Sequence, residues 1–210
     1  YANNNFNGLE YKMNKFDKDV SKLPHGITHL IFGHYFNQNI STLPPTLTHL
    51  FFGLNFNQDV LRLPPFLTHL TFGVYFNQDI SSLPHGITHL ILGYCFIKEC
   101  NVLPNIKYLK LDCNNSYIIN SLPNSVAELE LDYYFNLELN NLPTSIKKLF
   151  IWNHHYNEDL NCLPNFIEEL RLNTNYKKRI LNIPSNLKKL ICHKDYPHIN
   201  DFSNYCVEIY

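Results

Sequence analysis

A Leu-Pro or Ile-Pro pair recurs along the whole chain of 210 residues at a nearly constant spacing. Successive prolines are 19–21 residues apart, at Pro24, Pro44, Pro64, Pro84, Pro104, Pro123, Pro143, Pro164 and Pro184. A period of this length marks a repeat array, in which each unit packs only against its neighbours. One backbone conformation must therefore serve every unit, and the whole chain is predicted to be a single array.

The same apolar pattern, apolar-x-x-apolar-x-apolar, follows every one of these prolines, and we call it the strand frame. Its members are Ile27/Leu30/Phe32, Leu47/Leu50/Phe52, Leu67/Leu70/Phe72, Ile87/Leu90/Leu92, Ile106/Leu109/Leu111, Val126/Leu129/Leu131, Ile146/Leu149/Ile151, Ile167/Leu170/Leu172 and Leu187/Leu190/Cys192. The last two members alternate with outward positions, which is typical of a short strand with one buried face. Related frames at Phe6/Leu9/Tyr11 and Phe202/Tyr205/Val207 predict an end strand at each end of the array.

An aromatic residue follows the frame in most units and is expected to form a stacked column inside the coil. These residues are Phe36, Phe56, Phe76, Phe96, Phe135, Tyr156, Tyr176 and Tyr196. About twenty residues leave no room for a strand, two bends and a regular helix, and the proline removes a hydrogen-bond donor in every unit. The segment opposite the strand is therefore predicted to be extended, polyproline-like or a short 3₁₀ turn.

These patterns predict a β-rich solenoid, a right-handed coil with a parallel β-sheet on its concave face and little or no α-helix on its convex face. Residues 1–22 are predicted to be an incomplete first repeat or an N-terminal cap. Residues 23–196 are the repeat array, and residues 197–210 are predicted to be a C-terminal cap strand.

The strand frame at this period resembles a leucine-rich repeat, and the fuller unit, as in residues 43–60, closely resembles the FNIP repeat. The resemblance is clearest at Phe36-Asn37-Gln38, Phe56-Asn57-Gln58 and Phe76-Asn77-Gln78, and it continues as Phe135-Asn136 and Tyr156-Asn157. The chain departs from the family at Asn39, Asp59 and Asp79, where a proline is common. FNIP proteins are known mainly from social amoebae and giant amoeba-infecting viruses. Because their arrays often follow an F-box, the resemblance implies substrate recognition for an F-box type ubiquitin-ligase adaptor in a host cytoplasm.

Charge and hydropathy exclude two classes of partner. The chain has 17 Lys and Arg residues against 18 Asp and Glu residues, so no basic excess is available for a nucleic-acid backbone. No apolar run is long enough to span a membrane. We therefore expect neither nucleic acid nor a membrane as a partner.

The six cysteines and the first residues indicate where the protein is found. The cysteines lie at irregular spacings without a Cys-x-x-Cys pair, which favours free thiols in a reducing, cytoplasmic compartment. The chain opens at Tyr1 with neither a signal peptide nor an initiating Met, so we expect that an upstream segment has been removed.

Between Pro24 and Ile97 the only charged residues are Asp59, Arg62 and Asp79. A parallel sheet places equivalent residues of successive units in rows, and the row before the middle frame residue starts with four histidines. The residues predicted to bind a partner on the concave face are His29, His49, His69, His89, Ile31, Phe51, Thr71, Ile91, Tyr108, Lys110, Phe150, Trp152 and Arg171.

The four histidines allow two interpretations. Neighbouring imidazoles can share a metal ion or act as a pH switch, because like charges in a row lower each other's pKa. Alternatively, unit duplication alone places identical residues in register. We favour duplication, because a flat row does not converge on a tetrahedral metal site and no acidic side chain on the same face would set a tautomer. No metal and no cofactor are predicted.

The second half of the array carries alternating charges, such as Glu128 beside Lys148. These charges either satisfy one another or form a polar recognition patch around Trp152, with Phe150, Tyr133, Tyr134, His154 and His155 nearby. Trp152 itself can serve as a binding hot spot or fold over its neighbours as packing.

Two further rows have structural interpretations. The residues Asn37, Asn57, Asn77, Asn136 and Asn157 are predicted to be a ladder of side-chain amides that caps backbone groups at the bend. The glycines at positions 33, 53, 73 and 93 either relieve φ at the strand end or open room over the sheet.

The chain contains none of the common catalytic motifs, so we expect a non-enzymatic module that binds a protein partner. The alternatives are a structural repeat protein that associates with itself, a metal-dependent activity on the histidines, and a secreted protein like bacterial effector repeats that share the 20-residue unit.

Overall fold

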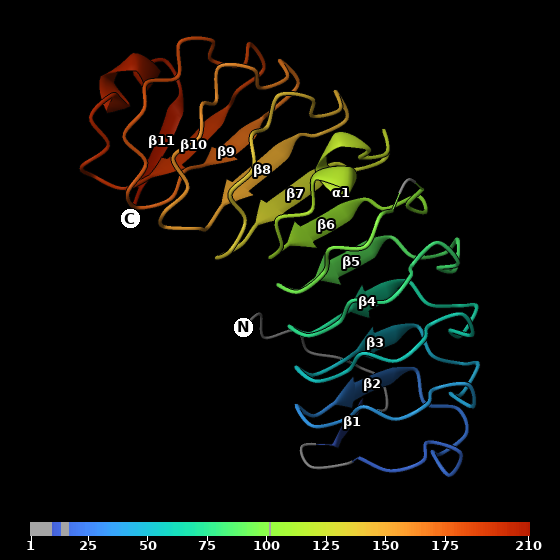
Figure 1. The fold of residues 1–210 in the computed structure, drawn as a ribbon. Helices are drawn as coiled ribbons and strands as arrows, with labels where there is room; N and C mark the ends of the chain where they lie inside the picture. Colours follow the sequence, from blue (N-terminus) through green and yellow to red (C-terminus); the bar gives the residue numbers. More distant parts are fainter. Residues whose placement is uncertain (1–9, 14–16, 101) are drawn as a thin grey trace. The chain divides into compact units, whose positions relative to one another are not determined.

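The computed structural model describes residues 10–13, 17–100 and 102–210 and divides into two compact units, residues 1–105 and 106–210. Each unit is a stack of short parallel strands joined by irregular loops (Figure 1). Unit 1 contains β1 (Glu10–Met13), β2 (His29–Phe32), β3 (His49–Phe51), β4 (His69–Thr71) and β5 (His89–Leu92). Unit 2 contains β6 (Tyr108–Leu111), α1 (Ser116–Asn120), β7 (Glu128–Leu131), β8 (Lys148–Ile151), β9 (Glu169–Arg171), β10 (Lys189–Cys192), a 3₁₀ helix (Ile199–Phe202) and β11 (Cys206–Ile209).

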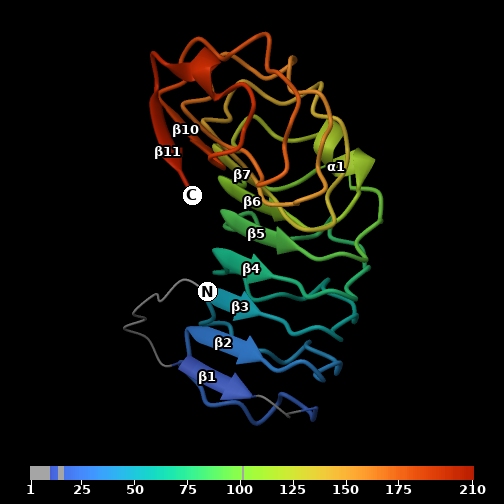
Figure 2. The same ribbon diagram turned by 90° about the vertical axis from the view of Figure 1, so that its left-hand side faces the viewer.

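Within each unit the strands lie side by side in chain order, as the two views in Figures 1 and 2 show. The register is the repeat itself, because His29 pairs with His49 and Leu30 with Leu50. Every strand pair described is parallel, and the five-residue α1 is the one α-helix in the described part of the chain. The predicted β-solenoid with little helix is confirmed.

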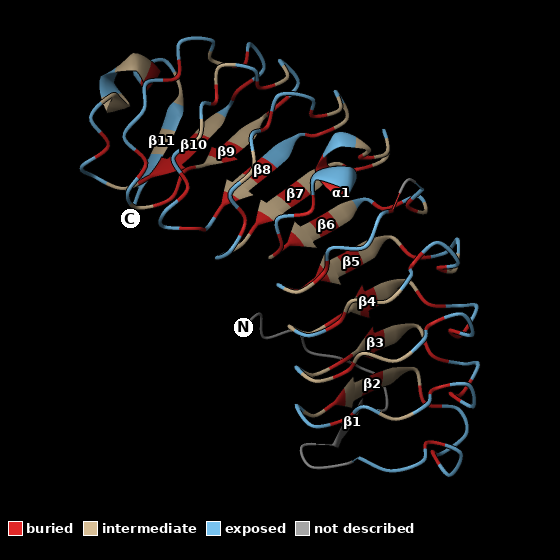
Figure 3. Ribbon diagram, in the orientation of Figure 1, coloured by how far each residue is buried: buried red, intermediate tan, exposed pale blue. Residues whose placement is uncertain are grey.

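The core lies behind the strands and is filled by the strand frame. The middle frame residues Leu30, Leu50, Leu70 and Leu90 are at most 1% exposed, and Figure 3 shows the alternation of buried and half-buried positions along β2 to β7. Burial of one such side chain contributes about 1.5–3 kcal/mol. Apolar burial repeated in every coil therefore holds the array together.

The proline opens a tight turn that leads into the next strand. In most coils the backbone N–H of the first frame residue donates to the proline carbonyl three residues earlier, as in Leu47 to Pro44 at 3.2 Å and Ile87 to Pro84 at 3.1 Å. Proline suits the first place of the turn because its own nitrogen needs no partner there.

The two end strands are shifted by two residues from the predicted frames. Tyr11 pairs with Leu30 at one end, and Val207 pairs with Leu190 at the other. The predicted middle positions, Leu9 and Tyr205, were therefore wrong. A shift by two keeps the same face of a strand inward, and the end frames lack the Leu-Pro pair that anchors the register elsewhere.

The aromatic column is buried throughout, but it is built differently in the two units. In unit 1 the phenylalanine rings stack face to face, with 6.0 Å between the ring centroids of Phe36 and Phe56. In unit 2 the hydroxyls of three tyrosines donate to carbonyl oxygens of the preceding coil. The bonds join Tyr156 to Leu137 at 3.3 Å, Tyr176 to Glu158 at 3.1 Å and Tyr196 to Lys178 at 3.0 Å.

An amide ladder runs beside the phenylalanine column in unit 1. The side-chain oxygen of Asn37 accepts hydrogen bonds from the backbone N–H of Asn57 at 2.9 Å and from the amide of Gln58 at 3.1 Å. Asp17 starts this ladder, and Asn77 ends it by accepting from the N–H of Ile97, which has no acceptor side chain.

In unit 2 the backbone N–H of Asn136 donates to the side-chain oxygen of Asn114 at 2.6 Å, and Asn114 was not part of the predicted ladder. The side chains of Asn136 and Asn157 cap no backbone group among the described residues, so the prediction was wrong for both. The tyrosine hydroxyls make the coil-to-coil bonds of this region instead.

The glycine row has neither of the two roles considered for it. The only positive φ among the described glycines is at Gly26. A Cβ atom at Gly53, Gly73 or Gly93 would overlap the carbonyl group of the glycine one coil earlier. Glycine is therefore required by the close approach of successive backbones.

We expect Gly73→Ala to lower the free energy of unfolding by about 2–4 kcal/mol, because the backbone groups that the new methyl meets cannot move aside. The control is Gly86→Ala, whose Cβ would lie 3.2 Å from the carbonyl oxygen of Leu67, and this change should cost about 1 kcal/mol or less. Urea unfolding followed by circular dichroism measures both. Equal midpoints for the two variants would contradict the close-approach explanation.

We expect Asn57→Ala to cost about 1–3 kcal/mol, since it removes the acceptor for the N–H of Asn77 at 2.8 Å and for the amide of Gln78 at 2.9 Å. Asn57→Asp keeps an acceptor oxygen, as Asp17 does at the first rung, and should stay within about 1 kcal/mol of the wild type. Thermal unfolding of both variants tests this. A loss as large for Asn57→Asp as for Asn57→Ala would show that the acceptor is not what matters.

Candidate interaction surface on the strand face

The outward side of β2–β5 is a strip without charged side chains, which we call the neutral strip. Its two rows are half-buried and consist of His29, His49, His69 and His89, and of Ile31, Phe51, Thr71 and Ile91. The register places each residue directly beside its equivalent on the next strand. All eight predicted binding residues of unit 1 therefore lie on one face.

The four histidines form a continuous stack of imidazole rings. The centroids of successive rings are 4.0 Å apart from His29 to His89, and the rings are inclined by only 13–14°. Such a stack covers the flat faces of the inner rings and leaves mainly their edges at the surface.

A threonine ladder sets the tautomer of these histidines. The hydroxyl of Thr48 lies 3.2 Å from the carbonyl oxygen of Thr28 and 2.9 Å from Nδ1 of His49. Because a carbonyl oxygen only accepts and a hydroxyl has one hydrogen, Thr48 donates to Thr28 and the Nδ1–H of His49 donates to Thr48. Thr68 and Thr88 repeat the arrangement. Threonine, rather than an acidic residue, thus orients the rings.

The inner histidines are held in the neutral form. Burial, followed by the neighbouring histidines, lowers the pKa of His49 and that of His69 to about 4. His49 and His69, at the centre of the neutral strip, therefore stay uncharged at neutral pH.

The stacked geometry does not suit a shared metal ion. A metal lies close to the plane of each imidazole that binds it, and rings that are parallel at 4.0 Å direct their nitrogens side by side rather than toward one point. Among the described residues, no group of three or more His, Cys, Asp or Glu side chains could hold a metal ion.

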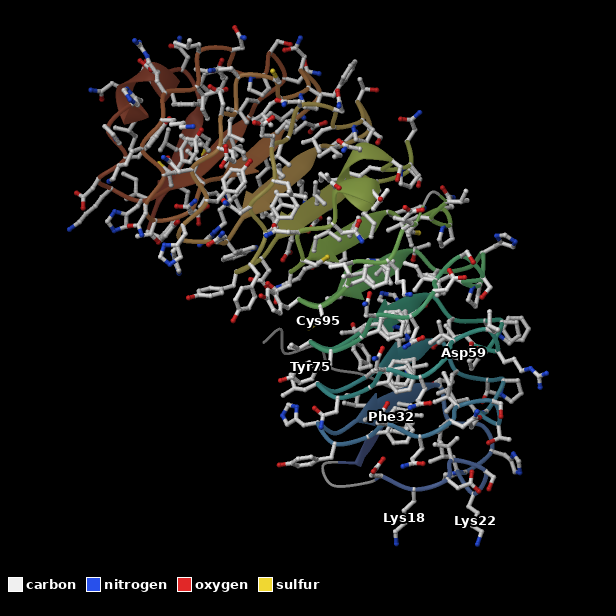
Figure 4. The ribbon with its side chains drawn as sticks, viewed as in Figure 1. Lys18, Lys22, Phe32, Asp59, Tyr75 and Cys95 are labelled. Atoms are coloured by element: carbon white, nitrogen blue, oxygen red, sulfur yellow. The ribbon has the colours of Figure 1, made fainter. Side chains whose placement is uncertain are left out.

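Exposed aromatic residues border the neutral strip, and the sequence analysis did not single them out. Tyr35, Tyr75 and Tyr94 are 47–63% exposed and lie in the turns that follow the strands. Figure 4 shows Tyr75 and Cys95 along this edge, Asp59 along the opposite edge and Phe32 between them. The sequence signal for these residues was a tyrosine two or three residues after the last frame residue. Its position differs between units, and not every unit has one.

The strand face of unit 2 carries charges that are mostly paired. Lys110 lies 2.6 Å from Asp132, Lys148 lies 3.4 Å from Glu128, and Lys189 lies 2.5 Å from Glu208. Half-buried Tyr108 hydrogen-bonds to Glu130, and its pKa is raised, first by burial. Cross-strand pairs of this kind contribute about 0.2–1 kcal/mol each.

Trp152 packs against a neighbouring side chain and remains partly exposed. Its ring packs against the guanidinium of Arg171 at 4.0 Å, while 37% of the residue stays exposed. Tyr133 contacts Tyr134 and His155 edge to face, with centroid distances of 4.9 and 6.4 Å. The structure thus gathers an aromatic cluster at the end of β7 and a separate stack on Arg171.

All six cysteines are free thiols. Cys100, Cys113 and Cys192 are buried, and burial raises the pKa of the Cys113 thiol to about 12. Within the described residues no helix is long and apolar enough to cross a membrane.

A family model described as FNIP Repeat matches residues 19–55, 56–95, 97–134, 114–154 and 156–195. The chain belongs to the FNIP repeat family. The matches extend from β2 to β10, and each of them spans two successive strands, so one match covers two coils of the solenoid.

The FNIP array is similar to two solved leucine-rich-repeat structures. CroV588, described as a novel circular LRR protein, is 35% identical with a TM-score of 0.72, and the match covers 89% of this chain and 30% of CroV588. The FNIP array thus spans less than a third of the length of CroV588. LegL7 from Legionella pneumophila is 17% identical with a TM-score of 0.56, over 89% of this chain and 82% of LegL7, which is a likeness of fold alone. A comparison with curated proteins gives no match.

We expect the free energy of unfolding of unit 1 to fall in acid, because the stacked histidines become protonated. The unfolded chain binds protons at His49 and His69 near pH 6.5, whereas the folded chain does so only near pH 4. Stability conferred by these groups is therefore complete above about pH 6.5 and is lost as the pH falls toward 4. After allowance for solvent screening, we expect a loss of about 1 kcal/mol per histidine.

The measurement compares urea unfolding at pH 7 and pH 4.5 for the wild type and for His69→Gln. The variant should lose less stability between the two pH values than the wild type does. His85→Gln, at an exposed loop position, is the control and should behave like the wild type. An identical pH dependence for all three proteins would remove the histidine stack as the cause.

Proposed function

We propose that this FNIP array is a protein-recognition module that binds its partner through the neutral strip of unit 1. The observation that carries this proposal is an uncharged, half-buried face with a border of exposed tyrosines. The centres of protein interfaces are poor in charge and rich in aromatic residues. The partner-binding roles of Ile31, Phe51, Thr71 and Ile91 follow from this surface.

The finer role rests on the family. Because FNIP arrays often follow an F-box, we propose that the array selects substrates for an F-box type ubiquitin-ligase adaptor in a host cytoplasm. This role predicts that the natural protein co-purifies with ubiquitin-ligase subunits and that its partner becomes ubiquitylated. The division into a first segment, residues 1–22, an array, residues 23–196, and a cap, residues 197–210, remains part of this proposal.

The test isolates the partner by affinity purification from the natural cytoplasm and then measures its binding to purified variants. We expect His49→Asp with His69→Asp to weaken binding at least tenfold, because the change puts two unpaired charges into the neutral strip. Lys148→Ala with Lys189→Ala should weaken it less than threefold, because these lysines are already paired with carboxylates on the same face.

Circular dichroism checks that each variant is folded, and Phe51→Ser provides a milder change in the same strip, with an expected loss of at least threefold. Equal losses, or a larger loss from the lysine pair, would place the interface in unit 2. Light scattering addresses self-association as the alternative function. A stable oligomer that the aspartate variants dissociate would favour that alternative.

A further inference from the structure

Arg171 differs from the other cations on the strand face of unit 2. Lys110, Lys148 and Lys189 each pair with a carboxylate of a neighbouring strand. The register places Phe150 on one side of Arg171 and Ile191 on the other. Within the part of the chain that the structure describes, the Arg171 guanidinium therefore makes no ion pair and no hydrogen bond.

The guanidinium instead packs over two aromatic rings. It lies 4.0 Å from the ring centroid of Trp152 and 4.4 Å from that of Tyr210. Tyr210 follows β11, yet its hydroxyl donates to the carbonyl oxygen of Leu172 at 2.7 Å, so its side chain crosses β10 to reach β9. We call Trp152, Arg171 and Tyr210 the arginine clamp.

The clamp leaves one kind of interaction open to Arg171. Two aromatic rings pack against the guanidinium and restrict its movement. No Arg171 nitrogen is among the described side-chain atoms that are buried without a partner, so its N–H groups are accessible to water and to a ligand. A planar carboxylate can satisfy two of them at once through a bidentate bond.

The charge of the surroundings selects among anions. The positive charge of Arg171 acts on the carboxylate of Glu208. The pKa of Glu208 is lowered first by its hydrogen bond to Lys189 and, as a smaller cause, by Arg171. Around Arg171, the strand face of unit 2 and the positions just after its strands carry more carboxylates than cations: the carboxylates are Asp112, Glu128, Glu130, Asp132, Glu169 and Glu208, and the cations are Lys110, Lys148, Arg171 and Lys189. A carboxylate group places one negative charge at Arg171, whereas a phosphate group places up to two on a single set of oxygens and would meet stronger repulsion there, so a carboxylate is favoured.

We propose that the arginine clamp binds an Asp or Glu side chain of the protein partner, edge-on to Arg171. This inference rests on the proposed function in one respect, which is that the bound carboxylate belongs to a protein partner. The clamp would give the partner's orientation, because a bidentate contact to a stacked guanidinium tolerates little rotation. Trp152 and Tyr210, at 37% and 42% exposure, would flank the bound residue.

The chain provides its own reporter for this site, because Trp152 is its only tryptophan. A capped triglutamate peptide is titrated at constant ionic strength while tryptophan fluorescence is recorded, with capped triglutamine and inorganic phosphate as comparison probes. We expect a saturable change with triglutamate, none with triglutamine, and binding of phosphate at least tenfold weaker than that of triglutamate.

Arg171→Met should weaken triglutamate binding at least tenfold, and Arg171→Lys should weaken it several-fold because the ammonium cannot form the planar fork. Arg179→Met is the matched control, since Arg179 pairs with Asp201 away from the strand face, and it should bind as the wild type does. Calorimetry repeats the titrations without dependence on fluorescence, and circular dichroism verifies folding. Unchanged binding by Arg171→Met, or phosphate binding as tight as triglutamate, would overturn the proposal.

The same variants separate this inference from the proposed function. If Arg171→Met binds the purified partner as tightly as wild type while His49→Asp with His69→Asp fails, the clamp proposal is wrong and the recognition role stands. If triglutamate binds at Arg171 but the aspartate variants keep full partner affinity, the clamp is supported and the neutral strip is not the interface.

Discussion

Backbone hydrogen bonding between successive coils is the constraint on which the rest of this structure depends. Because each strand pairs with the same positions of the next strand, the coils approach each other at the spacing of a β-sheet. Every residue therefore lies beside its own equivalent. A side chain is tolerated only if it packs beside the equivalent residue of the next coil, and at Gly53 and Gly73 no side chain fits at all.

The two units meet the same requirement with different chemistry. Unit 1 stacks phenylalanines and joins its coils through the oxygen atoms of Asp17, Asn37, Asn57 and Asn77. Unit 2 replaces three of the phenylalanines with tyrosines whose hydroxyls bond to the preceding coil. Burial accordingly raises the pKa of Tyr156, Tyr176 and Tyr196. In both units a buried aromatic ring and a polar bond between coils occur together.

Stacking also explains why the strand face divides into a neutral and a charged surface. Identical neutral rings can stack at 4.0 Å, as the histidines do, whereas charged residues must alternate in sign to lie in a row. The alternation fails at Arg171, whose row neighbours are Phe150 and Ile191. The proposed contact of Arg171 with a partner therefore lies where the neighbouring strands place no opposite charge beside it.

The strand frame, the coil length and the rows of outward residues could all be predicted from the sequence, because period and register coincide in a stacked array. The end strands could not, since a shift by two residues preserves the inward face. The threonine that sets each histidine tautomer was visible one position earlier in the sequence, but its bond depends on the side-chain geometry.

By itself, then, the sequence determined which residues share a row and a face. Only the tertiary structure decided contacts between unlike residues, such as Tyr210 reaching across β10 to Arg171. The physical reason is that repeat spacing sets the position of each Cα along the sheet, whereas such contacts depend on the direction of long side chains over neighbouring strands.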